Sequence, residues 1–328
     1  MGKCLVTKLK SVVDNNNLLH LGEMRISFPK YTNTSGKARS ITIKPSSAIT
    51  LSIVGPGYFT DSALSQNKGT TASLNAYVDN KLYISNDVVE VSVPDKYNLL
   101  HVFISCNSLF DLDTLKYSKA LETLDLYSSS SVGDIASLNK LTSLISITIL
   151  DSKGIYGDIS SLKNLTSLSG LYIDNCNKIT GDCASLEHLT SLRDEVRLVS
   201  NNLWMSDLSK FNKWTCKAIS LNVKDIKGDI AMLPSSCIFT NLTSQSNNGA
   251  TWSERPSSSK IMAMDSNLVL TNLDKMLQDQ ADCMVGYTSS DPAYYKIIKI
   301  SGTRTSASDA AIQTLQSKGY TVAIIPAS

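Results

Sequence analysis

The chain has 328 residues, of which 42% are hydrophobic, and a formal net charge of +2, so it is long enough for two or three domains with ample cores. Positive and negative charges are well mixed and no run of Lys or Arg is present, so we expect no dedicated nucleic-acid surface. No stretch approaches 18 consecutive apolar residues, so we expect no membrane span.

Residues 1–95 predict a small β-rich domain. Short runs such as SITIKPSSAITLSIVG and VVEVSV are separated by turn clusters at 55–57 and 66–70. We interpret this region as an antiparallel anchoring domain that ends near Pro94. Its N-terminal arm, about 1–30, lacks the apolar stretch of a secretory signal.

A 24-residue repeat dominates residues 96–240. The segments GDIASLNKLTSL, GDISSLKNLTSL and GDCASLEHLTSL begin at 133, 157 and 181. Each is followed by an L-x-x-L-x-L pattern that ends as a short strand, and each also carries apolar residues at the three-residue spacing of a 3₁₀ turn. One unit cannot bury its apolar side alone, so the repeat predicts a solenoid of stacked coils in which Leu165 and Leu168 lie between neighbours.

This pattern resembles the leucine-rich repeat and is most similar to the 24-residue class known from plant receptors. Ala136, Ser160 and Ala184 stand where that class has Pro, a departure that argues against its second small sheet. The resemblance implies an α/β solenoid with a parallel sheet on its concave side, and recognition of a protein or a glycan.

The C-terminal part predicts a linker followed by a cap. Residues 241–260 are rich in Ser and Asn and low in apolar residues, which is typical of a loop or linker. Within 261–328 we expect a helix over about 271–282, a strand over 294–300, a helix that stops at Gly319 and a strand over 320–325. This order predicts a parallel βαβ unit that covers the last coil.

The sequence carries no motif of a catalytic or metal site. The three histidines lie in different coils, and no nucleophile elbow, zincin, Walker A or dinucleotide-binding motif occurs. We therefore expect no enzyme activity, no cofactor and no metal. Asp134, Asp158 and Asp182 recur at one position and are interpreted as caps of the short turns, with a Ca²⁺ ladder as the alternative. The seven cysteines form no CxxC pair, which predicts reduced thiols and folding in a cytoplasm.

The variable positions of the solenoid strands define the candidate binding surface. Alternate residues of a strand face the same side, so two columns of side chains are expected on the concave face. Aromatic residues and Arg dominate recognition hot spots, whereas an ordinary polar face is the alternative interpretation. The candidate binding residues are Phe103, Asp125, Tyr127, Tyr172, Asp174 and Arg197.

The two ends of the chain carry a second resemblance. GKCLVTKLK near the start and AIQTLQSKGYTVAI near the end are similar to segments of leucine-rich proteins of gut Bacteroidetes and their phages, including tail-appendage proteins. This resemblance implies a phage tail or appendage subunit, made in the bacterial cytoplasm and located in the virion tail. Its N-terminal domain would contact other tail or appendage proteins, and its repeats would bind a protein or glycan on a bacterial surface. A bacterial cell-surface or intracellular interaction protein is the alternative, and a homo-oligomer is left open.

Overall fold

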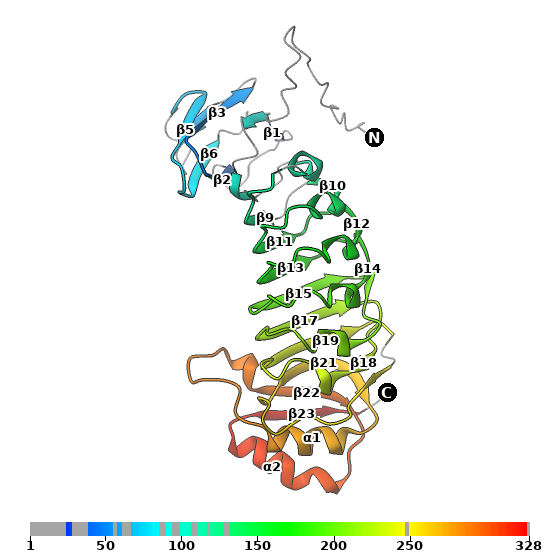
Figure 1. The fold of residues 1–328 in the computed structure, drawn as a ribbon. Helices are drawn as coiled ribbons and strands as arrows, with labels where there is room; N and C mark the ends of the chain where they lie inside the picture. The colour runs from blue at the N-terminus through cyan, green and yellow to red at the C-terminus, as the bar shows by residue number, and fades with distance from the viewer. Residues whose placement is uncertain are drawn as a thin grey trace.

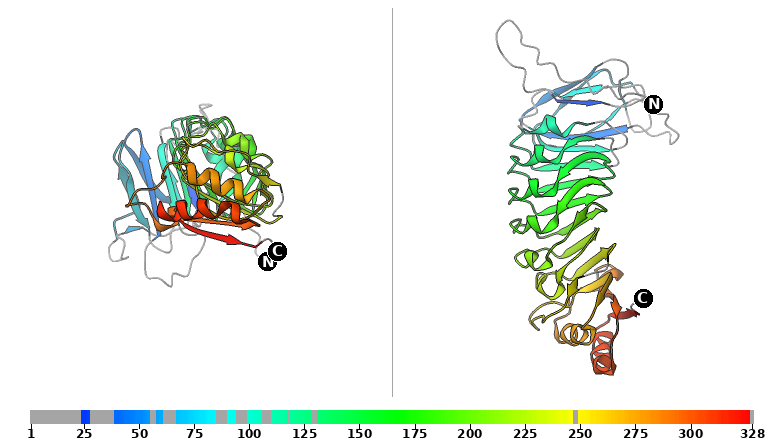
Figure 2. Two further views of the ribbon diagram at one scale, coloured as in Figure 1. Left: turned by 90° about the horizontal axis from the view of Figure 1, so that it is seen from below. Right: turned by 90° about the vertical axis from the view of Figure 1, so that its right-hand side faces the viewer.

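The repeats fold into coils that stack into an elongated solenoid, as the computed structural model shows (Figures 1 and 2). Each coil contributes a strand to one side and a short 3₁₀ helix to the other. This architecture confirms the predicted leucine-rich-repeat solenoid. The structure describes residues 24–27, 39–54, 58–60, 67–84, 90–93, 99–105, 110–116, 118–127, 131–246 and 249–326.

One 13-stranded sheet runs the length of the molecule, in the order β23-β22-β21-β19-β17-β15-β13-β11-β9-β8-β2-β6-β4. Neighbours from β8 to β23 are parallel, and the outward side of this part of the sheet is called the concave face below. The solenoid strands are β8 (Leu99–Ser105), β9 (Thr123–Tyr127), β11 (Ser146–Leu150), β13 (Gly170–Asp174), β15 (Glu195–Ser200), β17 (Ala218–Val223) and β19 (Phe239–Ser244).

The apolar repeat positions form a continuous core between the coils. Ile147, Leu171 and Val196 are neighbours across three successive strands and are fully buried. Leu165 and Leu168 are also 0% exposed, which confirms their predicted burial. Stacking therefore supplies each coil with the apolar contacts that it cannot make alone.

Short 3₁₀ helices line the side opposite the sheet, and each is capped by an aspartate. In every case the carboxylate accepts the backbone N–H two residues on, at 2.8–3.0 Å, which confirms the capping interpretation. A glycine precedes four of the six aspartates, Asp134, Asp158, Asp182 and Asp229, whereas Phe110 and Ser206 precede the other two. Gly181 has φ +115°, and a Cβ there would lie 2.6 Å from Asp158 Oδ1 of the preceding coil. The helices are η2 (Leu112–Leu115), η3 (Ile135–Leu138), η4 (Ile159–Leu162), η5 (Cys183–Leu186), η6 (Leu208–Phe211) and η7 (Ile230–Met232).

A second small parallel sheet forms beside these helices, although the missing prolines argued against it. It contains β10 (Val132–Asp134), β12 (Gly154–Asp158), β14 (Lys178–Asp182) and β16 (Leu203–Trp204). Ala136, Ser160 and Ala184 lie in the 3₁₀ helices, after the residues that pair. The pairing therefore does not depend on proline at that position, and the expectation was wrong.

The N-terminal β strands are joined to the solenoid by backbone hydrogen bonds. Strand β2 (Arg39–Pro45) pairs antiparallel with β8, and β6 (Asn80–Ile84) and β4 (Phe59–Thr60) follow it in the main sheet. A separate antiparallel sheet consists of β1 (Met24–Ser27), β7 (Glu90–Val93), β3 (Ile49–Val54) and β5 (Thr71–Leu74). Most of the predicted N-terminal arm and Pro94 lie outside the described residues.

The predicted linker over 241–260 is part of the solenoid, so that prediction was wrong. Its first residues belong to β19, and β20 (Ala250–Thr251) pairs with β18 (Gly228–Asp229). Trp252 and Arg255 are 1% and 3% exposed. The Arg255 guanidinium donates to the carbonyls of Ala231, Leu233 and Pro234, so the Ser- and Asn-rich stretch is fastened to the coil before it.

The C-terminal region continues the main sheet and adds two helices. Strands β22 and β23 pair in parallel across α2, which confirms the predicted strand–helix–strand unit. Buried polar contacts fasten α1 to the solenoid, since Asp279 accepts from Trp252 Nε1 and Gln280 exchanges two hydrogen bonds with the Met262 backbone. The elements are β21 (Ala263–Leu270), α1 (Leu273–Asp282), η8 (Ala293–Lys296), β22 (Ile297–Gly302), η9 (Ser306–Ser308), α2 (Asp309–Ser317) and β23 (Thr321–Ile325).

Candidate recognition surface

The strand register aligns the candidate residues in two columns across the concave face. Neighbouring strands are about 4.8 Å apart, so residues of one column lie side by side. The first column contains Phe103, Asp125, Thr148, Tyr172, Arg197, Ser220 and Asn241. The second contains Tyr127, Leu150, Asp174, Val199, Asn222 and Thr243.

Phe103, Tyr127 and Asp125 gather at the N-terminal end of this surface. The rings of Phe103 and Tyr127 have centroids 5.3 Å apart. Asp125 is bound by His101, whose Nε2 lies 2.9 Å from Asp125 Oδ2 and whose Nδ1 lies 2.8 Å from Asp79 Oδ1. Asp125 Oδ2 is therefore already engaged by a side chain of β8.

His101 links the N-terminal strands to the solenoid by contacting a carboxylate on each side. Burial lowers the pKa of His101, but hydrogen bonds and charges of Asp125 and Asp79 outweigh it and raise the pKa above 6.5. Only the imidazolium can donate to both carboxylates at once. Sequence reasoning did not find this contact, because Asp79 lies 22 residues away in the turn before β6.

Arg197, Asp174 and Tyr172 form a second group on β13 and β15. Arg197 Nε donates to Asp174 Oδ2 at 2.8 Å, and Nη2 lies 2.7 Å from the same oxygen. Tyr172 is the cross-strand neighbour of Arg197. Strand β11, with Thr148 and Leu150, separates this group from Tyr127. The candidate residues therefore form two clusters rather than one.

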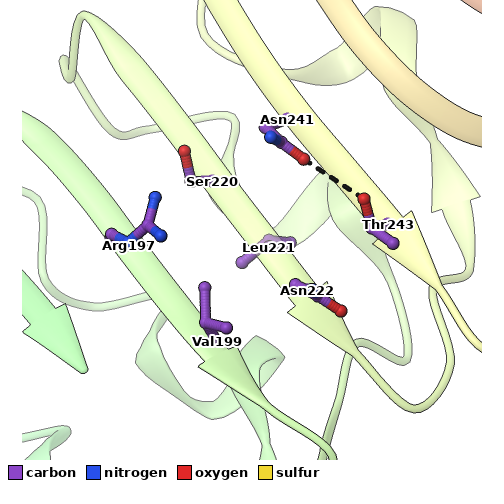
Figure 3. Close-up of a pocket in the computed structure, with 7 residues that line it drawn as sticks. All are labelled: Arg197, Val199, Ser220, Leu221, Asn222, Asn241 and Thr243. Atoms are coloured by element: carbon purple, nitrogen blue, oxygen red, sulfur yellow. Dashed lines mark hydrogen bonds between the residues drawn. The ribbon is translucent and has the colours of Figure 1, made fainter. Parts of the chain in front are cut away.

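A shallow pocket adjoins Arg197 on its C-terminal side (Figure 3). Its volume is about 120 Å³, and Arg197, Val199, Ser220, Leu221, Asn222, Asn241 and Thr243 line it. Thr243 Oγ1 donates to Asn241 Oδ1 at 3.2 Å. The Asn222 amide and the Ser220 hydroxyl also line the pocket. Pockets that enclose a small-molecule ligand are several times larger, so this one accommodates a single functional group of a ligand lying on the surface. Asn241 and Thr243 were missed because they fell within the predicted linker.

The described residues give no support for a metal centre or for Cys176 as a nucleophile. Within the described ranges, no group of three or more His, Cys, Asp or Glu side chains is placed to hold a metal ion. Burial raises the pKa of the Cys176 thiol to about 11, so this sulfur stays protonated and unreactive at neutral pH. None of the helices in the described part of the chain is long and apolar enough to cross a bilayer.

Comparisons with known proteins concern the fold. A comparison with protein-family models finds no match, and a comparison with curated proteins finds none either. An internalin C2 of Listeria monocytogenes is 13% identical, with a TM-score of 0.41 over 74% of this chain and 87% of that chain. An internalin of the same organism, inlF, is 16% identical, with a TM-score of 0.40 over 74% of this chain and 71% of that chain. The chain is thus similar in part to these two proteins, and its own parallel sheet and 24-residue coils are those of a leucine-rich-repeat solenoid.

Proposed function

We propose that the protein is a non-enzymatic recognition protein that binds a protein or glycan through the concave face. The observation that carries this proposal is the group of Tyr172, Asp174 and Arg197 beside the pocket in Figure 3. These side chains lie on the outward side of the sheet and are not needed for the core between the coils.

The Arg197–Asp174 pair supports binding because it holds the guanidinium in place. Asp174 accepts from Nε and Nη2, while 40% of the Arg197 side chain stays exposed. A guanidinium has further N–H donors, which can bind carbonyl or hydroxyl oxygens. Asn222 and Asn241 add amide donors and acceptors nearby. Peptide backbones and sugar hydroxyls both present groups that fit this arrangement.

The biological setting that we propose is a phage tail or appendage, with a bacterial cell-surface or intracellular protein as the alternative. The resemblance of the terminal segments supports this setting, and we propose that the N-terminal β region is the attachment part. Antibody detection of the chain in purified virions would support it. Detection in the host cell envelope alone, with none in virions, would favour the alternative.

The central test is replacement of Tyr172 by Ala. This change should leave the fold intact and weaken binding to bacterial cells by on the order of 2 kcal/mol, about 30-fold, if Tyr172 is a hot spot. Binding of fluorescently labelled protein to a panel of bacterial strains measures the effect. The matched control is His188→Ala, since His188 follows η5 on the opposite side and its side chain is 71% exposed. Equal effects of the two changes would exclude the concave face as the binding site.

A further inference from the structure

Glu195 is a carboxylate on the concave face that has no cationic partner among the described residues. It begins β15 and is half-buried, and its Oε1 accepts from Ser220 Oγ at 3.2 Å. Its partner on β17 is Ala218, and on β13 Gly170 precedes Leu171, the partner of Val196, so neither neighbour has a polar side chain. A partly buried charge without a counter-ion is costly, so this carboxylate is a candidate for pairing with a cation from outside.

Aromatic rings flank Glu195 on both sides. On one side the Tyr172 ring lies over Gly170, where an added Cβ would be 3.5 Å from Tyr172 Cε2. On the other side, Phe239 is the strand neighbour of Ala218, and the rings of Tyr294 and Tyr295 pack against it at 5.0 and 5.5 Å.

The two tyrosines come from a distant part of the chain. They lie in η8, within the segment that joins α1 to β22, and this segment projects toward the same side of the molecule as β3 and β5 (Figures 1 and 2). Tyr294 is 48% exposed, so the rim that they form is open to solvent.

The pKa shifts of Tyr172 and Tyr295 are consistent with their position beside Glu195. Burial and the Glu195 charge raise the pKa of Tyr172, and burial, Tyr294 and Glu195 raise the pKa of Tyr295. Both phenols therefore stay neutral and present uncharged ring faces beside one carboxylate. At the same rim, Lys217 Nζ already lies 2.9 Å from Asp291 Oδ1 and 5.2 Å from the centroid of Tyr295. This pair shows that the rim holds a cation between a carboxylate and a tyrosine ring.

We propose that Glu195, Tyr172 and Tyr295 form a subsite for a basic side chain, best an arginine, of a protein partner. The carboxylate pairs with the guanidinium while the rings contact its flat face. A neutral sugar could stack on the rings but would leave the charge of Glu195 unpaired, so the subsite favours a protein. This inference rests on the proposed recognition function and narrows its partner class.

The test uses a pair of small probes that differ in charge but hardly in shape. N-acetyl-arginine amide and N-acetyl-citrulline amide are titrated into the full chain, and the NMR signals of labelled tyrosines are followed. Arginine amide should shift the Tyr172 and Tyr295 signals in a saturable way, and citrulline amide should bind about five- to tenfold more weakly. Glu195→Gln, which keeps an acceptor for Ser220, should weaken arginine amide binding by about the same factor.

Glu187→Gln is the control for charge removal, since Glu187 caps the end of η5 on the opposite side, and it should change nothing. Equal binding of the two probes, unchanged binding to Glu195→Gln, or no shift on the order of 10 mM probe would overturn the proposal. The cell-binding assay separates this outcome from failure of the recognition function. If Tyr172→Ala weakens cell binding and Glu195→Gln does not, only the subsite for a basic side chain is excluded.

Discussion

Replacing His101 by Ala should lower the free energy of unfolding by about 2 kcal/mol near pH 5, and by much less near pH 9. The contact with Asp125 joins two side chains that are 19% and 16% exposed, and a hydrogen bond between charged groups in such a site contributes about 1.5 kcal/mol. The Asp79 carboxylate is 56% exposed, so its contact contributes about 0.5 kcal/mol.

The direction of the pH dependence follows from the raised pKa. The stabilisation is fully present below pH 6.5, the usual His value, and is lost as the pH rises through the folded-state pKa, which lies above it.

Urea unfolding of wild type and His101→Ala at both pH values measures this difference. Hydrogen exchange of the β6 amides reports local opening, because the contacts join an end of the stack that can unfold separately. A double-mutant cycle with Asp125→Asn isolates the larger contact. The reasoning fails if His101→Ala has the same cost near pH 5 and pH 9, or if the cycle shows no coupling.

Three further predictions concern the core, the thiols and the glycine that precedes an aspartate cap. Leu165→Ala should lower the free energy of unfolding by about 2–5 kcal/mol, measured by chemical denaturation. An unchanged denaturation midpoint would contradict the burial of Leu165 between stacked coils. Thiol titration of the denatured, unreduced protein should find all seven cysteines, as in the sequence, whereas a single reactive group would indicate three disulfides. Gly181→Ala should destabilise by about 1–3 kcal/mol, since φ is +115° and the new Cβ would crowd Asp158; a neutral effect would show that this turn rearranges freely.

The features that repeat at a fixed spacing are those that the sequence predicts well. Leu165 and Leu168 are buried, and Tyr172 and Arg197 are neighbours, because equivalent positions of a stacked repeat must align. The capping role of the aspartates follows from the same regularity. The predicted domain boundaries near residues 95, 240 and 260 stay predictions, although the main sheet runs continuously across all three.

The features that depend on distant or irregular segments were missed. Strand β19 reads FTNLTS, in which Leu242 faces the core, and its polar neighbours hid it within a Ser- and Asn-rich stretch. The contact of His101 with Asp79 depends on a turn from the N-terminal strands, and Tyr295 reaches the concave face from beyond α1. Composition and periodicity describe local chain preferences, and neither reports contacts that only the folded backbone creates.

The continuity of the main sheet also affects how such a protein can change during evolution. Strands on both sides of the solenoid pair with it in the same way as its own coils pair with each other. Duplication of one 24-residue unit between β11 and β13 would therefore leave the interfaces at both ends unchanged and lengthen the concave face by one strand spacing, about 4.8 Å. A one-residue insertion within a strand would instead turn apolar positions toward solvent. The length of the concave face can thus change by whole repeat units, while the exposed residues of each unit are free to vary.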